Sequence, residues 1–89
     1  GYADAQFNLG LMYANGEGIS QDMAQAAELF KKAAEQGHVD AQNNLGAMYY
    51  TGEGVERDEK KAVEWFEKAA AQGNEDARAN LEAIKASGK

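Results

Sequence analysis

The chain has 89 residues, a formal net charge of −6 and no cysteine. A chain of this length forms at most one small domain. The lack of cysteine excludes a disulfide framework and a thiolate metal site, and the acidic balance disfavours nucleic acid and anionic membranes as partners, because both require a basic surface.

A 36-residue repeat organises the chain. Residues 1–36 and 37–72 are identical at 20 of 36 positions, and residues 73–89 begin a weaker third copy. Periods of 20 to 50 residues are typical of solenoids, in which each repeat is one supersecondary unit. Proline is absent and helix formers dominate, so helices are favoured over strands. We expect two repeats and a capping helix that unfold as one cooperative domain.

The first helix of repeat 1 is predicted over residues 3–15. Its apolar residues recur at helical spacing and are expected to face inward: they are Ala5, Leu9, Met12 and Tyr13. Gly16 follows the last turn and suits a left-handed C-cap, and Gly18 allows a second unusual backbone angle in the same loop.

The second helix of repeat 1 is predicted over residues 23–36, with Asp22 as its N-cap. Its inward stripe comprises Ala26, Leu29, Phe30, Ala33 and Ala34. Repeat 2 follows the same plan, with helices predicted over 39–51 and 58–72. The inward residues of these two helices are Ala41, Leu45, Met48 and Tyr49, then Ala62, Trp65, Phe66, Ala69 and Ala70, and the loop between them contains Gly52 and Gly54.

Gly10 and Gly46 lie in the middle of predicted helices, where glycine costs about 1 kcal/mol relative to alanine. We expect close approach of the second helix of each repeat to offset that cost. In the third copy, Glu82 and Lys85 replace the glycine and the tyrosine of this helix. Residues 75–87 are therefore predicted to form a polar-faced C-terminal cap, which solenoids need for solubility.

The two full copies resemble the Sel-1-like repeat family, a relative of the tetratricopeptide repeats. The matching residues of repeat 1 are Ala5, Leu9, Gly10, Tyr13, Gly16, Gly18, Ile19, Ala26, Phe30, Ala33, Ala34 and Gly37. Those of repeat 2 are Ala41, Leu45, Gly46, Tyr49, Gly52, Gly54, Val55, Ala62, Phe66, Ala69, Ala70 and Gly73. The resemblance implies an all-α, right-handed superhelix of helical hairpins, with the first helix of each repeat on the concave side. It also implies an adaptor or scaffold for protein partners and no enzymatic activity.

The residues alone point to no catalytic, cofactor or metal site. The single histidine, His38, follows a glycine and is interpreted as a turn or helix-start residue. Glu17 and Glu53 lie in the glycine loops, where they would repel phosphate. No spacing typical of a Ca²⁺ loop or of a histidine pair occurs.

The candidate partner site is the groove on the first helices, at positions rotated away from the core. These residues are Phe7, Leu11, Ala14 and Asn15 in repeat 1 and Asn43, Ala47, Tyr50 and Thr51 in repeat 2. All eight differ between equivalent positions, whereas most core positions are identical. Asp4, Asp40 and Asp76 border this surface, so a groove that captures acidic peptide ends is disfavoured.

Three apolar groove residues, Phe7, Leu11 and Tyr50, are the expected anchors for a protein or peptide segment. The alternative is that Phe7 and Leu11 are partly covered by neighbouring helices or by a missing upstream repeat. A second hypothesis treats the chain as a designed or truncated solenoid without a ligand of its own, a monomer or weakly self-associating through an uncapped N-terminal end. It rests on Gly1, which is equivalent to Gly37 and Gly73 and so begins at a repeat boundary.

Overall fold

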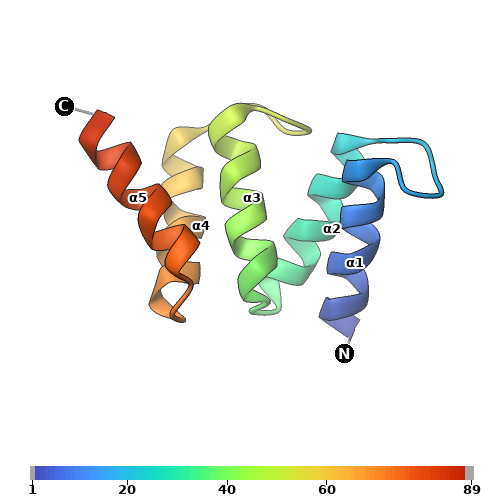
Figure 1. The fold of residues 1–89 in the computed structure, drawn as a ribbon, viewed down its shortest axis with the longest axis horizontal. Helices are drawn as coiled ribbons and strands as arrows, with labels where there is room; N and C mark the ends of the chain where they lie inside the picture. Colours follow the sequence, from blue (N-terminus) through green and yellow to red (C-terminus); the bar gives the residue numbers. More distant parts are fainter. Residues whose placement is uncertain (1, 88–89) are drawn as a thin grey trace.

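The computed structural model describes residues 2–87, and every regular element in this range is a helix. The five helices are α1 (Tyr2–Asn15), α2 (Met23–Glu35), α3 (Val39–Thr51), α4 (Glu59–Ala71) and α5 (Glu75–Ser87). They lie side by side in an elongated array of 41 × 25 × 16 Å, with α1, α3 and α5 in one layer and α2 and α4 in a second layer behind it (Figure 1). This arrangement confirms the predicted all-α solenoid of two helical hairpins followed by a fifth helix.

The helix ends follow the predicted capping residues. The carboxylate of Asp22 accepts the Gln25 backbone N–H at 3.1 Å and begins α2. Asp58 does the same for Lys61 at the start of α4, so it is the N-cap of that helix and not its first residue, as the sequence had suggested. Gly16 and Gly52 have φ values of +72° and +80°, the left-handed conformation expected after α1 and α3.

The glycines inside α1 and α3 allow a close approach of the aromatic side chains of α2 and α4. A Cβ atom on Gly10 would lie 2.8 Å from the Phe30 ring, and one on Gly46 would lie 2.8 Å from the Phe66 ring. Neither distance leaves room for a methyl group. The predicted reason for these glycines is therefore confirmed, and the neighbour that requires them is a phenylalanine.

Two clusters of buried side chains form the core. The first spans α2 and α3 and comprises Ala26, Ala27, Phe30, Ala33, Ala34, Ala41, Leu45 and Met48. The second spans α4 and α5 and comprises Ala62, Phe66, Ala69, Ala77, Leu81 and Ile84. The small alanines let the helices pack closely, while one phenylalanine fills the centre of each cluster. On α5, Glu82 and Lys85 are exposed, as expected of a polar cap.

The inward stripe predicted for α1 is wrong at three of its four positions. Leu9 is 40% exposed, Met12 is 37% exposed and Ala5 is also exposed. Their equivalents on α3 are buried, because α3 packs against α2 on one side and α4 on the other. Among the described residues, α1 packs chiefly against α2, so only one of its sides is covered.

Buried glutamines join the two layers, a feature that the sequence interpretation missed. Gln36 donates from its side-chain amide to the Gln6 Oε1 atom at 2.6 Å, and Gln72 donates to the Gln42 Oε1 atom at 2.9 Å. Gln42 also donates to the backbone carbonyl of Ala34 in the preceding repeat at 3.2 Å. Each buried amide is thus paired, as burial of a polar group requires. The two bonds lock the start of each hairpin to its end.

Candidate functional site

The predicted groove residues all lie on the layer formed by α1 and α3, but they differ in accessibility. Asn15, Ala47 and Thr51 are exposed. The other five are half-buried: they are Phe7, Leu11, Ala14, Asn43 and Tyr50. The layer therefore has a part that is filled by its own side chains and a part that remains open.

Repeat 1 contributes the filled part. The Phe7 ring lies 5.6 Å from the Phe30 ring and 4.6 Å from the His38 ring, measured between centroids, and the His38 pair is stacked. Leu11 and Ala14 pack against the first core cluster. Of the two interpretations of Phe7 and Leu11, these contacts favour coverage by neighbouring helices. Phe7 therefore holds the start of α3 against α1.

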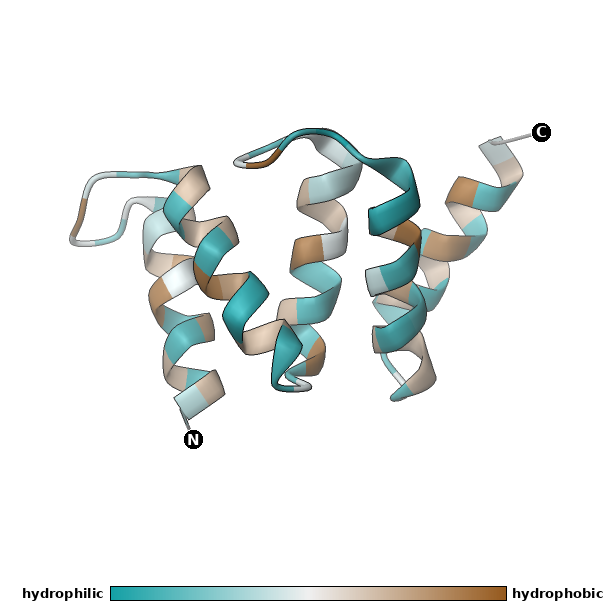
Figure 2. Cartoon of the chain, turned by 180° about the vertical axis from the view of Figure 1, so that it is seen from behind, coloured by the Kyte–Doolittle hydropathy of each residue, from teal (hydrophilic) through white to brown (hydrophobic). Residues whose placement is uncertain are grey.

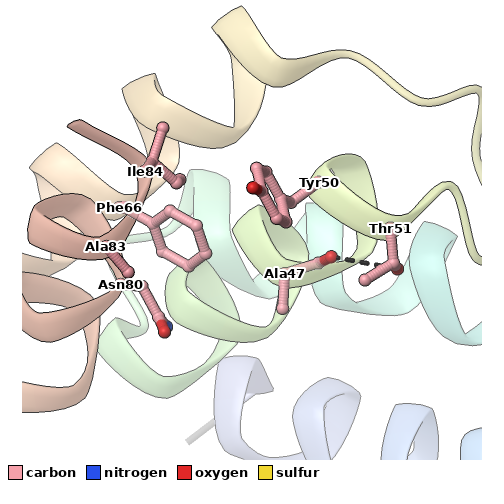
Figure 3. A pocket seen from close by; sticks show the side chains of 7 residues that line it. All are labelled: Ala47, Tyr50, Thr51, Phe66, Asn80, Ala83 and Ile84. Carbon is pink, nitrogen blue, oxygen red and sulfur yellow. Dashed lines mark hydrogen bonds between the residues drawn. The ribbon is translucent and has the colours of Figure 1, made fainter. Parts of the chain in front are cut away.

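Repeat 2 contributes the open part, a pocket of about 240 Å³ between α3 and α5. In Figure 3, Ile84, Ala83 and Asn80 of α5 line one side, Tyr50, Ala47 and Thr51 of α3 line the other, and the Phe66 ring of α4 lies between them. Three of the predicted groove residues, Ala47, Tyr50 and Thr51, are thus brought together around one cavity.

Two of the polar side chains at this pocket, Thr51 and Asn80, are already paired within the chain. The Thr51 hydroxyl donates to the backbone carbonyl of Ala47 at 3.1 Å, the bond drawn dashed in Figure 3. The Asn80 side-chain amide donates to the Asn43 Oδ1 atom at 3.2 Å. What the pocket offers to a ligand is therefore mainly apolar surface from an aromatic ring, alanine methyl groups and Ile84.

The size of one side chain accounts for the difference between the two parts. Ala47 is equivalent to Leu11 and Asn43 is equivalent to Phe7. Leu11 packs against the first core cluster in repeat 1, whereas the smaller Ala47 lines the open space beside Phe66 in repeat 2. Repeat 1 therefore indicates which side chain would fill the pocket of repeat 2, namely a leucine in place of Ala47.

The sequence interpretation missed two residues of the pocket, Asn80 and Ile84, and assigned Phe66 to the core alone. Asn80 had a signal, because asparagine occupies the same position in all three copies as Asn8, Asn44 and Asn80. Ile84 is 9% exposed and belongs to the second core cluster, so its side chain serves the fold and the pocket wall together. No pattern in the sequence indicates that a core residue of α5 also lines a pocket.

Electrostatic features of the layer are modest. Arg57 donates from its Nε atom to the Tyr50 backbone carbonyl at 2.8 Å, and its guanidinium carbon lies 5.4 Å from the centre of the Tyr50 ring. This contact fixes the tyrosine at the pocket rim. The charge that it brings lies beside the pocket and does not line it.

His38 has a structural use that occupies both ring nitrogens. Its Nδ1 atom accepts the Ala41 backbone N–H at 3.1 Å and caps α3, and its Nε2 atom lies 2.9 Å from the Asp4 carboxylate. Within residues 2–87 no three potential metal ligands of the His, Asp or Glu type converge. None of the five described helices has the length and hydropathy required to cross a bilayer.

Comparison with known proteins identifies the repeat. The Sel1 repeat family matches residues 3–38 and again residues 39–74. The comparison with curated proteins gives no match.

Among solved structures, the chain is 35% identical to a Sel1 repeat protein from Oxalobacter formigenes, with a TM-score of 0.93 over 97% of this chain and 35% of that one. It is 45% identical to a protective antigen of uropathogenic Escherichia coli with an SLR fold, with a TM-score of 0.96 over 98% of this chain and 19% of that one. It is 38% identical to cysteine-rich protein B of Helicobacter pylori, with a TM-score of 0.85 over 89% of this chain and 59% of that one. The chain therefore spans between about a fifth and three fifths of the length of these relatives.

Proposed function

Because this chain belongs to the Sel1 repeat family, we propose that it is a protein-interaction module that holds a segment of a partner protein against the layer of α1, α3 and α5. Members of this family are helical solenoids that generally bind other proteins. The proposal includes no chemical reaction, since the one histidine is engaged in capping α3.

The observation that supports this proposal best is the pocket between α3 and α5. Its volume of about 240 Å³ exceeds the roughly 150 Å³ of an apolar cavity known to accept benzene. An aromatic or large aliphatic side chain of the partner would fit, with the Phe66 ring below it and Tyr50 at its side. Binding energy at interfaces is concentrated in such anchor residues, which fill desolvated pockets.

Selection of peptides from a displayed library tests the proposal. We expect the selected peptides to share one aromatic or large aliphatic position. The variant Ala47→Leu places in the pocket the residue that repeat 1 carries at Leu11, so the fold should tolerate it. Because the leucine would occupy the pocket, Ala47→Leu should remove one buried anchor, which contributes roughly 1.5–3 kcal/mol. Peptide binding should therefore weaken by about tenfold or more.

The matched control is Ala79→Leu. Ala79 is an exposed residue of α5, equivalent to Phe7 and Asn43, and it does not line the pocket. This variant makes the same chemical change on the same layer, so binding should stay within about twofold of the parent chain. Equal affinity of Ala47→Leu and the parent chain would show that the pocket is not used, and selected peptides that bind away from this layer would exclude the proposed function.

A second candidate function is end-to-end association through the outer side of α1. Leu9 and Met12 are exposed there, whereas the identical Leu45 and Met48 of α3 are covered by α2. A helix resembling α2 would fit the same surface on α1. Sedimentation over a wide concentration range should then show association that Leu9→Lys abolishes. A chain that remains monomeric throughout that range would exclude this candidate.

A further inference from the structure

A second cavity lies on the opposite layer and has a different chemical character. It measures about 210 Å³ and is lined by residues of α2, α3 and α4: they are Lys31, Tyr49, Lys61, Glu64, Trp65 and Lys68. Figure 2 views the molecule from behind, where α2 and α4 face the reader and many of their residues are coloured as hydrophilic. We call this cavity the lysine cleft.

Aromatic rings hold two of the three lysines in place. The Lys61 Nζ atom lies 5.5 Å from the centre of the Tyr49 ring, and the Lys68 Nζ atom lies 4.8 Å from the centre of the Trp65 ring. Contacts of this kind contribute about 0.5–1 kcal/mol at exposed sites. The rings therefore gather the ammonium groups at the cleft without neutralising them.

The positive charge of the cleft is largely uncompensated. Glu64 is the one carboxylate among the lining residues, against three lysines. None of the ion pairs within 4.0 Å found among residues 2–87 includes Lys31, Lys61 or Lys68. In a chain with a net charge of −6, this is a local reversal of sign.

We propose that the lysine cleft binds an acidic peptide segment of a partner protein, one that carries several Asp or Glu residues in succession. Charge complementarity supports this assignment, because three cations from two helices face one opening. A single exposed ion pair contributes only about 0–1 kcal/mol, so a lone carboxylate would bind too weakly to be held. A run of carboxylates engages all three lysines together. This surface is separate from the pocket between α3 and α5, and the inference does not depend on the proposed function of that pocket.

The other repeat supplies variants that should preserve the fold. Lys61 is equivalent to Gln25 and Trp65 is equivalent to Leu29. Lys61→Gln therefore introduces a residue that already occupies this position in a helix of the same kind. Lys60→Gln is the matched control, since Lys60 is the neighbouring exposed lysine of α4 and does not line the cleft.

Titration with a hexaglutamate peptide at low salt tests the proposal. Binding is measured by calorimetry and by tryptophan fluorescence. Trp65 is the only tryptophan of the chain, so its emission reports directly on the cleft. We expect saturable binding that shifts this emission and weakens as salt screens the charges. Lys61→Gln should weaken binding about two- to fivefold, which corresponds to one exposed ion pair. Lys60→Gln should leave it unchanged.

Three results would overturn the proposal. The first is no saturable binding of hexaglutamate, and the second is equal weakening by Lys61→Gln and Lys60→Gln, which would indicate a diffuse charge effect. The third is tighter binding of inorganic phosphate or of single-stranded RNA than of hexaglutamate, which would assign the cleft to phosphate groups. A hexalysine peptide is the control for the sign of the charge, and it should not shift the Trp65 emission.

Discussion

Helices α1 and α3 are identical at 8 of their 13 equivalent positions and have different surroundings. Leu9 and Leu45 are equivalent residues, yet Leu9 is 40% exposed and Leu45 is fully buried. On the opposite side the relation is reversed, since Leu11 packs against the core while the equivalent Ala47 is exposed and lines a pocket. One difference arises from the neighbouring helices and the other from the residues themselves.

Two properties of a repeat can be told apart by comparing α1 with α3: which residues can form a core, and which residues form the solvent-facing surface. Identity between copies marks the residues that can form a core, and the presence of a flanking helix decides whether they do so. Divergence between copies marks the surface that each repeat presents to solvent. In this chain the divergence from Leu11 to Ala47 accompanies an open apolar pocket between α3 and α5.

The largest expected effect concerns the paired leucines. Leu45→Ala removes a fully buried side chain and should lower the free energy of unfolding by about 2–5 kcal/mol. Leu9→Ala removes a side chain that is 40% exposed and should cost about 1 kcal/mol or less. Chemical denaturation of both variants measures the difference. Equal losses would mean that α1 is covered in solution by another helix or another copy.

The loop glycines give the second comparison. Gly18 and Gly54 have φ values of +74° and +76°, so alanine is strained at either position. A Cβ atom on Gly54 would also overlap the backbone carbonyl oxygen of Met23, whereas one on Gly18 has no neighbour within 4 Å. We expect Gly54→Ala to lower the free energy of unfolding by about 2–4 kcal/mol and Gly18→Ala by about 1 kcal/mol. The same denaturation assay checks both values, and a larger loss for Gly18→Ala would contradict the packing described for the two loops.

The third prediction concerns a substitution that gives repeat 1 the residue that repeat 2 carries at the equivalent position. Leu11→Ala should open a pocket over Phe30 that corresponds to the one beside Phe66. Because Leu11 is half-buried, the loss should be about 1–2 kcal/mol, less than for a fully buried leucine. A crystal structure of the variant would show the new cavity. Collapse of the neighbouring side chains into that space would refute the view that residue size alone keeps the second pocket open.

The smallest expected effect concerns the residue before α3. His38 is equivalent to Asn74, whose Oδ1 atom accepts the Ala77 backbone N–H at 2.8 Å, so His38→Asn retains a helix cap. The variant loses the stacked contact with Phe7, and we expect a loss of about 0.5–1 kcal/mol. His38→Ala should cost about 0.5–2 kcal/mol more, because it removes the cap as well. Indistinguishable losses for the two variants would rule out a capping role.

Much of this fold could be predicted from the sequence because the repeat imposes it. The glycine at position 46 inside a helix predicted a close neighbour, which is the Phe66 ring. Asp22 before an apolar stripe predicted a cap, and its carboxylate forms the expected bond. Such features depend on residues close together in the chain or at a fixed offset of one repeat.

The rest depends on which elements surround a residue, and a periodic pattern does not contain that information. The stripe that buries Leu45 is present in α1 as well, but there one side lacks a covering helix among the described residues. The pocket was foreseen only in part, since Ala47, Tyr50 and Thr51 were expected on the groove while Asn80 and Ile84 of its α5 wall were not. The lysine cleft escaped notice because its cations come from different helices and meet only in the folded chain.

The most direct test of the central claim is an NMR titration of the parent chain and Ala47→Leu with toluene, which mimics an aromatic side chain. We expect saturable chemical-shift changes at the Ile84 and Ala83 methyl groups of the parent chain, because both residues line the pocket. Ala47→Leu, with its pocket filled by a leucine as in repeat 1, should show no such changes and should remain as stable as the parent chain within about 1 kcal/mol. Equal shifts in both proteins, or none in the parent chain, would contradict the claim that this pocket receives an apolar side chain of a partner.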